Sequence, residues 1–340
     1  MRPFTDLTPR GQLRRLHALA TEALRGWALP REPTLRLLNH GENTVYGVRT
    51  PGTPELHVLR IHRSDYHPMD HLVSEARWLD YLQGEGIGAP AAERDIQGNP
   101  VRHVQTEGMP EGRHVTLLRK TPGRMRDYDH WGPTHAAEVG KLLARMHRAA
   151  ERFEAPAGFS RRVLDAEGLV GPTASWGDPL AEPLLDKAGK DLFAWGRDRL
   201  FEELGTLPRD RTAWGMTHTD LHGGNVLFAD GVAKAIDFDD LAHAWFVSDF
   251  AVNLVPVRWR NPDLADGMLA GYRSVRPLSD EALAALPTFH CARRMMGVAW
   301  ARSRADVPRL IKWLPWRIQF AMRTLQAWKD GDDPLLVKPD

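Results

Sequence analysis

The sequence contains a single cysteine among its 340 residues, Cys291, so no intrachain disulfide can form. Disulfide frameworks are typical of secreted domains, and their absence fits the reducing cytoplasm. No apolar run approaches the roughly 20 residues that a membrane-spanning helix needs. The opening MRPFTDLTPRGQ also lacks the apolar core of a signal peptide. These absences predict a cytoplasmic protein that has no membrane partner.

An excess of charge of one sign is also lacking. The chain has 45 Lys and Arg residues against 44 Asp and Glu residues, a formal net charge of +1. Nucleic-acid-binding proteins usually carry a strong basic excess, so we expect no nucleic-acid partner. Lysine itself is scarce, because only eight of those 45 basic residues are Lys. The length is sufficient for two lobes or domains with a large core.

The most informative stretch is THTDLHGGNVLFADGVAKAIDFDD, residues 217–240. Asp230-Gly231 separates two apolar runs in it, and this dipeptide favours the tight turn of a β-hairpin. A hairpin brings its ends together, so we expect the polar loop before it and the acids after it to meet. The polar residues of this stretch are His218, Asp220, Asn225, Asp237 and Asp239.

These residue types suit the transfer of a phosphoryl group to a hydroxyl. The reaction needs a carboxylate that orients the hydroxyl and takes its proton, and oxygen ligands that hold Mg²⁺ on the phosphates. Asp220 is the candidate base. Asn225 and Asp237 are the candidate Mg²⁺ ligands, because Mg²⁺ prefers hard oxygen donors. Asp239 is a further candidate, either for the metal or for the acceptor.

The residues alone leave two other interpretations of this stretch open. One is a solvated loop followed by a polar hairpin with no chemistry. The other is a dinuclear Zn²⁺ or Mn²⁺ site, since His and Asp ligate both metals. Its ligands would be His218, Asp220, His222, Asp237 and His243. Such a site has less need of Asn225 and of the hairpin, and phosphoryl transfer explains both.

The pattern H-x-D-x-x-x-x-N followed by D-F-D resembles the catalytic loop and metal-binding motif of protein kinases. Its variant H-x-D-x-H-x-x-N with I-D-F-D is similar to the aminoglycoside phosphotransferase and homoserine kinase type II group. The segment HAWFVSDFA, residues 243–251, extends that resemblance. The resemblance implies an α+β, bilobal protein-kinase-like fold with a small antiparallel-sheet lobe and a larger, mostly helical lobe. It also implies that His218 and Asp249 brace the catalytic loop.

The same resemblance assigns nucleotide-binding roles ahead of this stretch. The turn HGENT, residues 40–44, would bring the backbone amides of Asn43 and Thr44 to phosphate oxygens. A cation on the strand HVLRIHR, here Arg60, would hold the phosphates and pair with Glu75 on the next helix. Most kinases have Lys at this position, and Arg retains the charge with a different geometry.

The resemblance also suggests where adenine binds and where the lobes divide. Main-chain groups around Leu118 would face the purine edge, with Leu227 and Ile236 on one side of the ring. Val45 and Val58 would cover its other side. The expected division is a nucleotide-binding lobe over 1–118, a hinge over 119–124 and a helical catalytic and acceptor lobe over 125–340.

Apolar periodicity, caps and turn residues predict the remaining elements. The predicted helices cover residues 9–26, 70–83, 135–153, 183–205, 263–275, 279–302 and 308–328, and the predicted strands lie within 34–63, 101–105 and 114–119. We expect Asp70 and Ser248 to cap helices, Glu111-Gly112 to form a turn and His147 to be a satisfied core histidine. The cluster Arg293, Arg294, Arg302 and Arg304 is more simply a solvated helix face than an acceptor site.

The predicted function is an ATP- and Mg²⁺-dependent phosphotransferase that moves the γ-phosphate to a hydroxyl of a small molecule, such as an amino alcohol, a sugar or an aminoglycoside. The alternative acceptor is protein Ser/Thr, because the Glu-Asn turn, the run Asp237–Asp240 and the segment WLPWRIQFAMRTLQAW resemble the bacterial stress-response kinase. A weakly active nucleotide-binding regulator is a third hypothesis, supported only by Arg60. The protein would be a monomer or a dimer.

Overall fold

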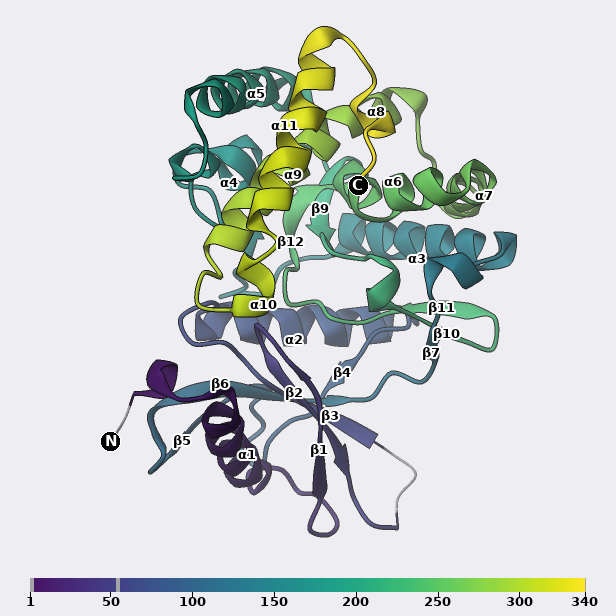
Figure 1. The fold of residues 1–340 in the computed structure, drawn as a ribbon. Coiled ribbons are helices and arrows are strands. Elements are labelled where there is room, and N and C mark those ends of the chain that lie inside the picture. Colours follow the sequence, from purple (N-terminus) through teal and green to yellow (C-terminus); the bar gives the residue numbers. More distant parts are fainter. Residues whose placement is uncertain (1–2, 53–55, 340) are drawn as a thin grey trace. The chain divides into compact units, whose positions relative to one another are not determined.

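The computed structural model describes residues 3–52 and 56–339 (Figure 1). The chain forms two compact units. The first comprises Met1–Thr121 and Ala155–Ser160, and the second comprises Pro122–Glu154 and Arg161–Asp340. The first unit contains an antiparallel sheet and the second is mostly helical, so the predicted α+β class is confirmed.

A six-stranded sheet organises the first unit. The strand order is β1-β2-β3-β6-β4, β5 also pairs with β6, and every pairing is antiparallel. The strands are β1 (Thr34–His40), β2 (Thr44–Arg49), β3 (Leu56–Ile61), β4 (Ala91–Ala92), β5 (Arg102–Thr106) and β6 (Met109–Arg119). Two helices, α1 (Pro9–Leu24) and α2 (Met69–Gly84), and the 3₁₀ helix Phe4–Asp6 complete the unit.

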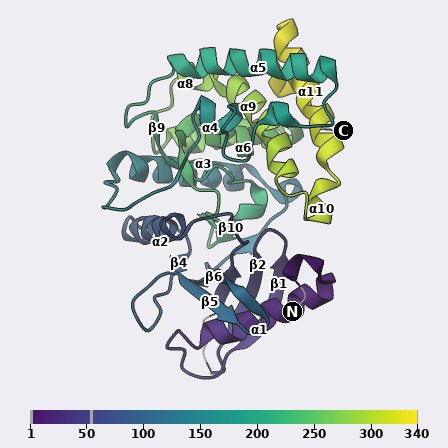
Figure 2. The ribbon, with the colours of Figure 1, turned by 90° about the vertical axis from the view of Figure 1, so that its left-hand side faces the viewer.

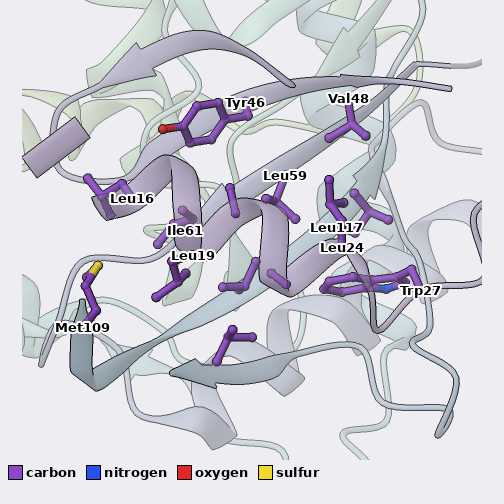
Figure 3. Close-up of a cluster of buried hydrophobic side chains, with 14 residues drawn as sticks. Leu16, Leu19, Leu24, Trp27, Tyr46, Val48, Leu59, Ile61, Met109 and Leu117 are labelled. Atoms are coloured by element: carbon purple, nitrogen blue, oxygen red, sulfur yellow. The ribbon is translucent and has the colours of Figure 1, made fainter. Parts of the chain in front are cut away.

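Helix α1 covers one face of this sheet (Figure 3). Its apolar side packs against inward-facing residues such as Tyr46, Leu59 and Leu117, all at most 2% exposed. Successive side chains of a strand point to opposite faces, so the residues next to these lie on the other face of the sheet. That opposite face therefore carries Arg60 and Leu118, two of the residues expected to bind the nucleotide.

The second unit is built from helices around two small sheets (Figure 2). Its helices are α3 (Pro133–Arg152), α4 (Ala166–Val170), α5 (Lys187–Thr206), α6 (Phe250–Arg260), α7 (Pro262–Arg273), α8 (Asp280–Ala284), α9 (Leu286–Arg302), α10 (Pro308–Ile311) and α11 (Leu314–Asp330). One sheet has the order β11-β10-β7 and the other β8-β12-β9. The strands are β7 (Arg124–Met125), β8 (Arg162–Val163), β9 (Trp214–Thr217), β10 (Val226–Ala229), β11 (Val232–Ala235) and β12 (Ala242–Trp245).

Helices α3 and α7 pack closely because each has a glycine at their contact. A Cβ atom at Gly140 of α3 would lie 1.9 Å from the carbonyl oxygen of Met268. A Cβ atom at Gly271 of α7 would lie 2.1 Å from the carbonyl oxygen of Ala137. Both distances are too short for a side chain, so the two backbones can meet here only at glycine.

Most predicted elements are present, including the helices near 9–26, 70–83, 135–153 and 183–205. The predicted turn at Glu111-Gly112 is wrong, because both residues lie inside β6. The chain reverses between Thr106 and Met109, which are register partners. Gly112 has a φ of 70°, which glycine tolerates, and the register shifts on the facing strand between Val104 and Thr106.

Several predicted helix boundaries are also wrong. The expected helices over 279–302 and 308–328 are each divided into two, α8 with α9 and α10 with α11. Pro287 and Pro315 stand in the first turns of α9 and α11, where their missing N–H favours a new helix start. Ser248 lies in a 3₁₀ helix, Phe246–Asp249, and does not cap α6.

The prediction that Asp70 caps α2 is also wrong. Asp70 accepts a hydrogen bond from the adjacent His71 backbone amide at 3.0 Å and lies within the first turn of α2, so it is not the N-cap. The N-cap is Pro68.

Across residues 3–52 and 56–339, no helix has the length and apolarity needed to cross a membrane.

Candidate active site

The predicted hairpin is present and frames the candidate active site in the second unit. Strands β10 and β11 pair from Val226–Ala235 to Ala229–Val232. Asp230 and Gly231 both have positive φ, 52° and 78°, as the tight turn requires. Strand β9 ends at Thr217, paired with Ala242 of β12, and leads directly into the loop that contains His218 and Asp220.

Hydrogen bonds join the loop before the hairpin to the segment after it. The Asn225 Nδ2 donates to the Asp220 carbonyl oxygen at 2.9 Å. The Ile236 backbone amide donates to the Asn225 carbonyl oxygen at 3.0 Å. Asp237 follows Ile236 directly, so the residues at 220, 225 and 237 belong to one hydrogen-bonded region. Because Nδ2 faces a carbonyl, Oδ1 is the atom of Asn225 that suits a hard cation.

His218 holds the same two segments together. Its ring is buried, and its Nε2 donates to the Ile236 carbonyl oxygen at 3.0 Å. Its Nδ1 accepts from the Asp220 backbone amide at 3.3 Å, which makes the neutral Nε2–H tautomer the one that satisfies both bonds. Burial lowers the pKa of this imidazole and keeps it neutral. The dinuclear-metal interpretation loses one ligand, because neither ring nitrogen is left for a metal.

A buried carboxylate, Asp249, fixes the backbone of the catalytic loop. Its Oδ1 accepts from the Thr219 amide at 2.7 Å, and its Oδ2 accepts from the His218 amide at 3.3 Å. Thr219 has a φ of 64°, which is unusual for a β-branched residue. These charge-assisted bonds therefore stabilise a strained backbone at the residue before Asp220. The predicted bracing by Asp249 is present in the geometry.

His147 of α3 completes this support and is a satisfied core histidine, as predicted. Its Nε2 lies 3.1 Å from Asp249 Oδ2 and its Nδ1 lies 2.9 Å from the Tyr272 hydroxyl on α7. The ring also stacks on Phe246, with centroids 4.6 Å apart. Burial lowers the pKa of His147 despite the neighbouring carboxylate. Helices α3 and α7 thus position the catalytic loop through this network.

Arg293 of α9 binds the candidate base directly. Its Nη2 lies 2.8 Å from Asp220 Oδ1, and its Nη1 donates to the Thr219 carbonyl oxygen at 3.1 Å. His222 Nε2 lies 3.7 Å from the other carboxylate oxygen of Asp220. The Asp220 side chain is 33% exposed and that of Arg293 is 26% exposed, so both remain accessible. Sequence analysis missed this contact, because nothing in the chain links residues 73 positions apart.

The prediction of a solvated arginine face on α9 is therefore wrong. Arg302 forms an ion pair with Glu182, whose side chain is 1% exposed. Arg304, just beyond α9, is 1% exposed and lies over the Trp300 ring, 4.5 Å from its centroid. The amphipathic pattern did not show that loops and α11 cover this side of α9.

The segment that contains the predicted metal ligands is fixed through its backbone. Asp237 has a φ of 64° and is exposed. The Thr219 hydroxyl donates to the Asp240 carbonyl oxygen at 2.8 Å, and Arg161 Nη2 donates to the Asp239 carbonyl oxygen at 2.6 Å. These two bonds hold the backbone of the acidic run, and Arg162 Nη1 also lies 3.5 Å from the Asp240 side-chain oxygen Oδ1.

The first unit contains the predicted pair of Arg60 and Glu75. Arg60 Nη2 donates to Glu75 Oε1 at 2.5 Å, and the two residues are 5% and 2% exposed. Val45 and Thr116 are the register partners of Arg60 on the neighbouring strands, and Val58 pairs with Leu118. Directly paired side chains share a face, so Val45, Val58, Arg60 and Leu118 lie together on the face opposite α1.

The turn predicted to approach phosphate is stabilised by its own side chains. Asn43 Oδ1 accepts from the Arg63 amide at 3.1 Å, and the Asn43 carbonyl oxygen accepts from the Gly41 amide at 3.0 Å. The Thr44 hydroxyl lies 2.9 Å from His40 Nδ1. In the second unit, Leu227 and Ile236 are half-buried and share the outer face of the hairpin.

This fold and this arrangement of polar residues define a protein of the protein-kinase-like class. A match to the phosphotransferase enzyme family covers residues 34–286, most of the chain. The chain belongs to this family.

Three relatives show how far the similarity extends. Amicoumacin kinase of Bacillus subtilis is 28% identical over 230 residues, 66% of this chain and 63% of that protein. Homoserine kinase of Gluconobacter oxydans is 30% identical over 224 residues, 62% of this chain and 64% of that protein. The chain thus spans less than two thirds of the length of both. The structure of a microcompartment-associated aminopropanol kinase matches this one with a TM-score of 0.80 and 25% sequence identity. The match covers 95% of this chain and 100% of the aminopropanol kinase chain.

Proposed function

We propose that this protein is an ATP- and Mg²⁺-dependent phosphotransferase that moves the γ-phosphate to a hydroxyl of a small molecule. The observation that carries the proposal is the hydrogen-bonded region around Asp220. It connects one carboxylate, one amide oxygen and a second carboxylate through the bonds of Asn225 and Ile236. Phosphoryl transfer needs these three groups together, one for the nucleophile and two for the metal.

In this proposal, Asp220 accepts the hydrogen of the acceptor hydroxyl and takes the proton as the new O–P bond forms. The leaving group is ADP. Asn225 Oδ1 and the Asp237 carboxylate would hold Mg²⁺, and Asp239 would assist them or face the acceptor. A metal held there would neutralise charge on the phosphates. His218 and Asp249 are positioning residues, because both act through the backbone of the loop.

Residues of the first unit are proposed to bind ATP. Arg60, oriented by Glu75, would hold phosphate oxygens, and the backbone amides of Asn43 and Thr44 would bind the same group. The backbone at Leu118 would meet the adenine edge. The buried Arg60–Glu75 contact supports the first of these assignments.

The acceptor is proposed to be an amino alcohol, a sugar or an aminoglycoside-like compound. Kinases named for amicoumacin, homoserine and aminopropanol are among the relatives, which favours a small molecule over protein Ser/Thr. The regulator hypothesis has less support, because the loop around Asp220 has its full set of polar residues and internal bonds. The single cysteine remains consistent with the proposed cytoplasmic location.

A labelling experiment tests this function. The protein is incubated with γ-labelled ATP, Mg²⁺ and a cell lysate separated into small-molecule and protein fractions. We expect label in the small-molecule fraction with the wild type. Asp220→Asn should lower transfer by about 10²–10⁴-fold, because general-base catalysis contributes that much, while ATP binding is retained.

The control is Asp198→Asn, which changes an exposed acid of α5 and should leave transfer unchanged. Equal turnover by the wild type and Asp220→Asn would refute the proposed mechanism. Label on protein alone would instead support the Ser/Thr alternative.

A further inference from the structure

Helix α9 brings a guanidinium group to the catalytic loop from far along the chain. Arg293 lies near the middle of this 17-residue helix, 73 positions after Asp220. Its Nη2 donates to Asp220 Oδ1 at 2.8 Å, and its Nη1 donates to the Thr219 carbonyl oxygen at 3.1 Å. One planar group thus binds a backbone oxygen and a side-chain oxygen of consecutive residues, a two-point contact that guanidinium geometry favours.

The backbone half of this contact falls on the strained residue of the loop, Thr219, whose φ is 64°. Its amide donates to Asp249 Oδ1 at 2.7 Å, and its hydroxyl donates to the Asp240 carbonyl oxygen at 2.8 Å. The bond from Arg293 satisfies its remaining polar group, the carbonyl oxygen. All three polar groups of Thr219 are therefore bound, and the backbone that leads into Asp220 is held in one conformation.

The side-chain half of the contact makes the two carboxylate oxygens of Asp220 unequal. Oδ1 is bound to Arg293. Oδ2 lies 3.7 Å from His222 Nε2, which is longer than a hydrogen bond. The His222 ring is itself held, because its Nδ1 accepts from the Gly224 amide at 3.0 Å. Oδ2 is therefore the oxygen better suited to accept a hydrogen bond from an incoming hydroxyl.

This ion pair adds little to the stability of the fold, because water reaches both partners. The side chains of Arg293 and Asp220 are 26% and 33% exposed. Ion pairs in contact with water contribute little to stability on average. What the two-point contact does supply is a fixed orientation of one carboxylate. Orientation of a reacting group is a large part of catalysis, so the contact is better explained by the reaction than by folding.

We propose that Arg293 is a positioning residue for the base, and that it leaves Oδ2 of Asp220 as the oxygen that takes the proton of the acceptor. This inference rests on the proposed function and adds a residue to it. The acceptor hydroxyl donates its hydrogen to Oδ2. As the hydroxyl oxygen forms its bond to the γ-phosphorus, its O–H bond breaks and the proton passes to Oδ2. The bond from the γ-phosphorus to the ADP oxygen breaks, and Arg293 keeps Asp220 oriented throughout.

Truncation of Arg293 tests the inference directly. Arg293→Ala removes both hydrogen bonds and places a residue that favours helix in α9. A misplacement of about 1 Å can cost about 10²-fold in rate, so we expect kcat to fall by about 10- to 100-fold. The KM for ATP should stay within about threefold of wild type, because the lost contact orients the base and does not bind ATP. Rates are measured with γ-labelled ATP and the small-molecule fraction of the lysate.

Two further variants show whether Arg293 acts through Asp220. Arg293→Lys keeps the charge but replaces the planar fork by a point charge, so it should restore part of the lost kcat. In the Asp220→Asn background, Arg293→Ala should lower the remaining transfer by less than about twofold, because residues that act as a unit do not have additive effects. A loss in that background as large as in the wild-type background would overturn the inference.

Chemical denaturation and ATP binding separate positioning from folding. Arg293→Ala should unfold close to the wild-type midpoint and bind ATP as well as the wild type. Arg258→Ala, at an exposed arginine of α6, is the control and should match the wild type in every measurement. The inference is overturned by an unchanged kcat in Arg293→Ala, or by a fall in kcat that only follows lost stability and lost ATP binding. Absence of label with the wild type, while ATP still binds, would instead refute the proposed function itself.

Discussion

The buried pair of Arg60 and Glu75 allows stability and nucleotide binding to be separated by mutation. Both residues are at most 5% exposed, and their side chains are 2.5 Å apart. Arg60→Met leaves the Glu75 carboxylate buried without this partner. Breaking a buried ion pair in this way costs about 3–5 kcal/mol. We therefore expect this single variant to be strongly destabilised, as measured by chemical denaturation.

The double variant Arg60→Met/Glu75→Leu removes both charges and should recover most of that stability. Replacing a whole buried ion pair by apolar side chains of similar volume is often neutral or stabilising. ATP binding should not recover, because the proposed phosphate contact is still missing. A charge-assisted hydrogen bond contributes about 1.5–3 kcal/mol, so kcat/KM for ATP should fall about 10- to 150-fold.

The assay compares unfolding free energies with steady-state kinetics at varied ATP concentration. Arg36→Met is the matched control, because Arg36 is an exposed residue of β1 in the same sheet. Its unfolding free energy should change by less than about 0.5 kcal/mol. The reasoning fails if the double variant binds and uses ATP as well as the wild type, or if it is as unstable as Arg60→Met alone.

Two further predictions concern the second unit. Asp249→Asn should lower kcat by about 10- to 100-fold, with less effect on KM for ATP. The asparagine side chain has one acceptor oxygen where the carboxylate has two, so it cannot bind the backbone amides of both His218 and Thr219. An unchanged kcat would contradict this prediction. His290 is fully buried, and burial, then Arg294 and Arg293, hold its pKa well below the ordinary value. The unfolded histidine takes up a proton near pH 6.5 and the folded one does not, so stability should fall from pH 7 to 5.5 by up to about 1.4 kcal/mol per pH unit. His290→Leu should flatten this slope in denaturation experiments and the exposed-site variant His130→Leu should not; equal slopes in all three proteins would refute the assignment.

The contacts that the sequence could predict are those set by local spacing. The hairpin at Asp230-Gly231 follows from turn chemistry, whereas the pairing of Arg60 with Glu75 is implied by the resemblance to kinases. The contact between Arg293 and Asp220 could not be found in this way. It depends on how α9 packs in the second unit, and no short-range pattern records that packing.

The wrong helix boundaries have a related cause. Apolar periodicity continues across residues 279–302, so the pattern predicts one helix there. Pro287 removes a backbone donor and begins a new helix at α9, and that local effect prevails over the periodicity. The arginine face was misjudged because periodicity shows which side of a helix is polar. It does not show whether loops and other helices cover that side.

The left-handed backbone at Thr219 limits how the catalytic loop could be transferred to another protein. The conformation depends on Asp249, which is itself held by His147 on α3. Helix α3 can approach α7 only through Gly140 and Gly271. A peptide or a grafted segment with residues 217–240 would contain all the reactive groups and none of this support. The reactive geometry is thus a property of the whole second unit. A design that transfers residues 217–240 to another protein must also include helices α3 and α7.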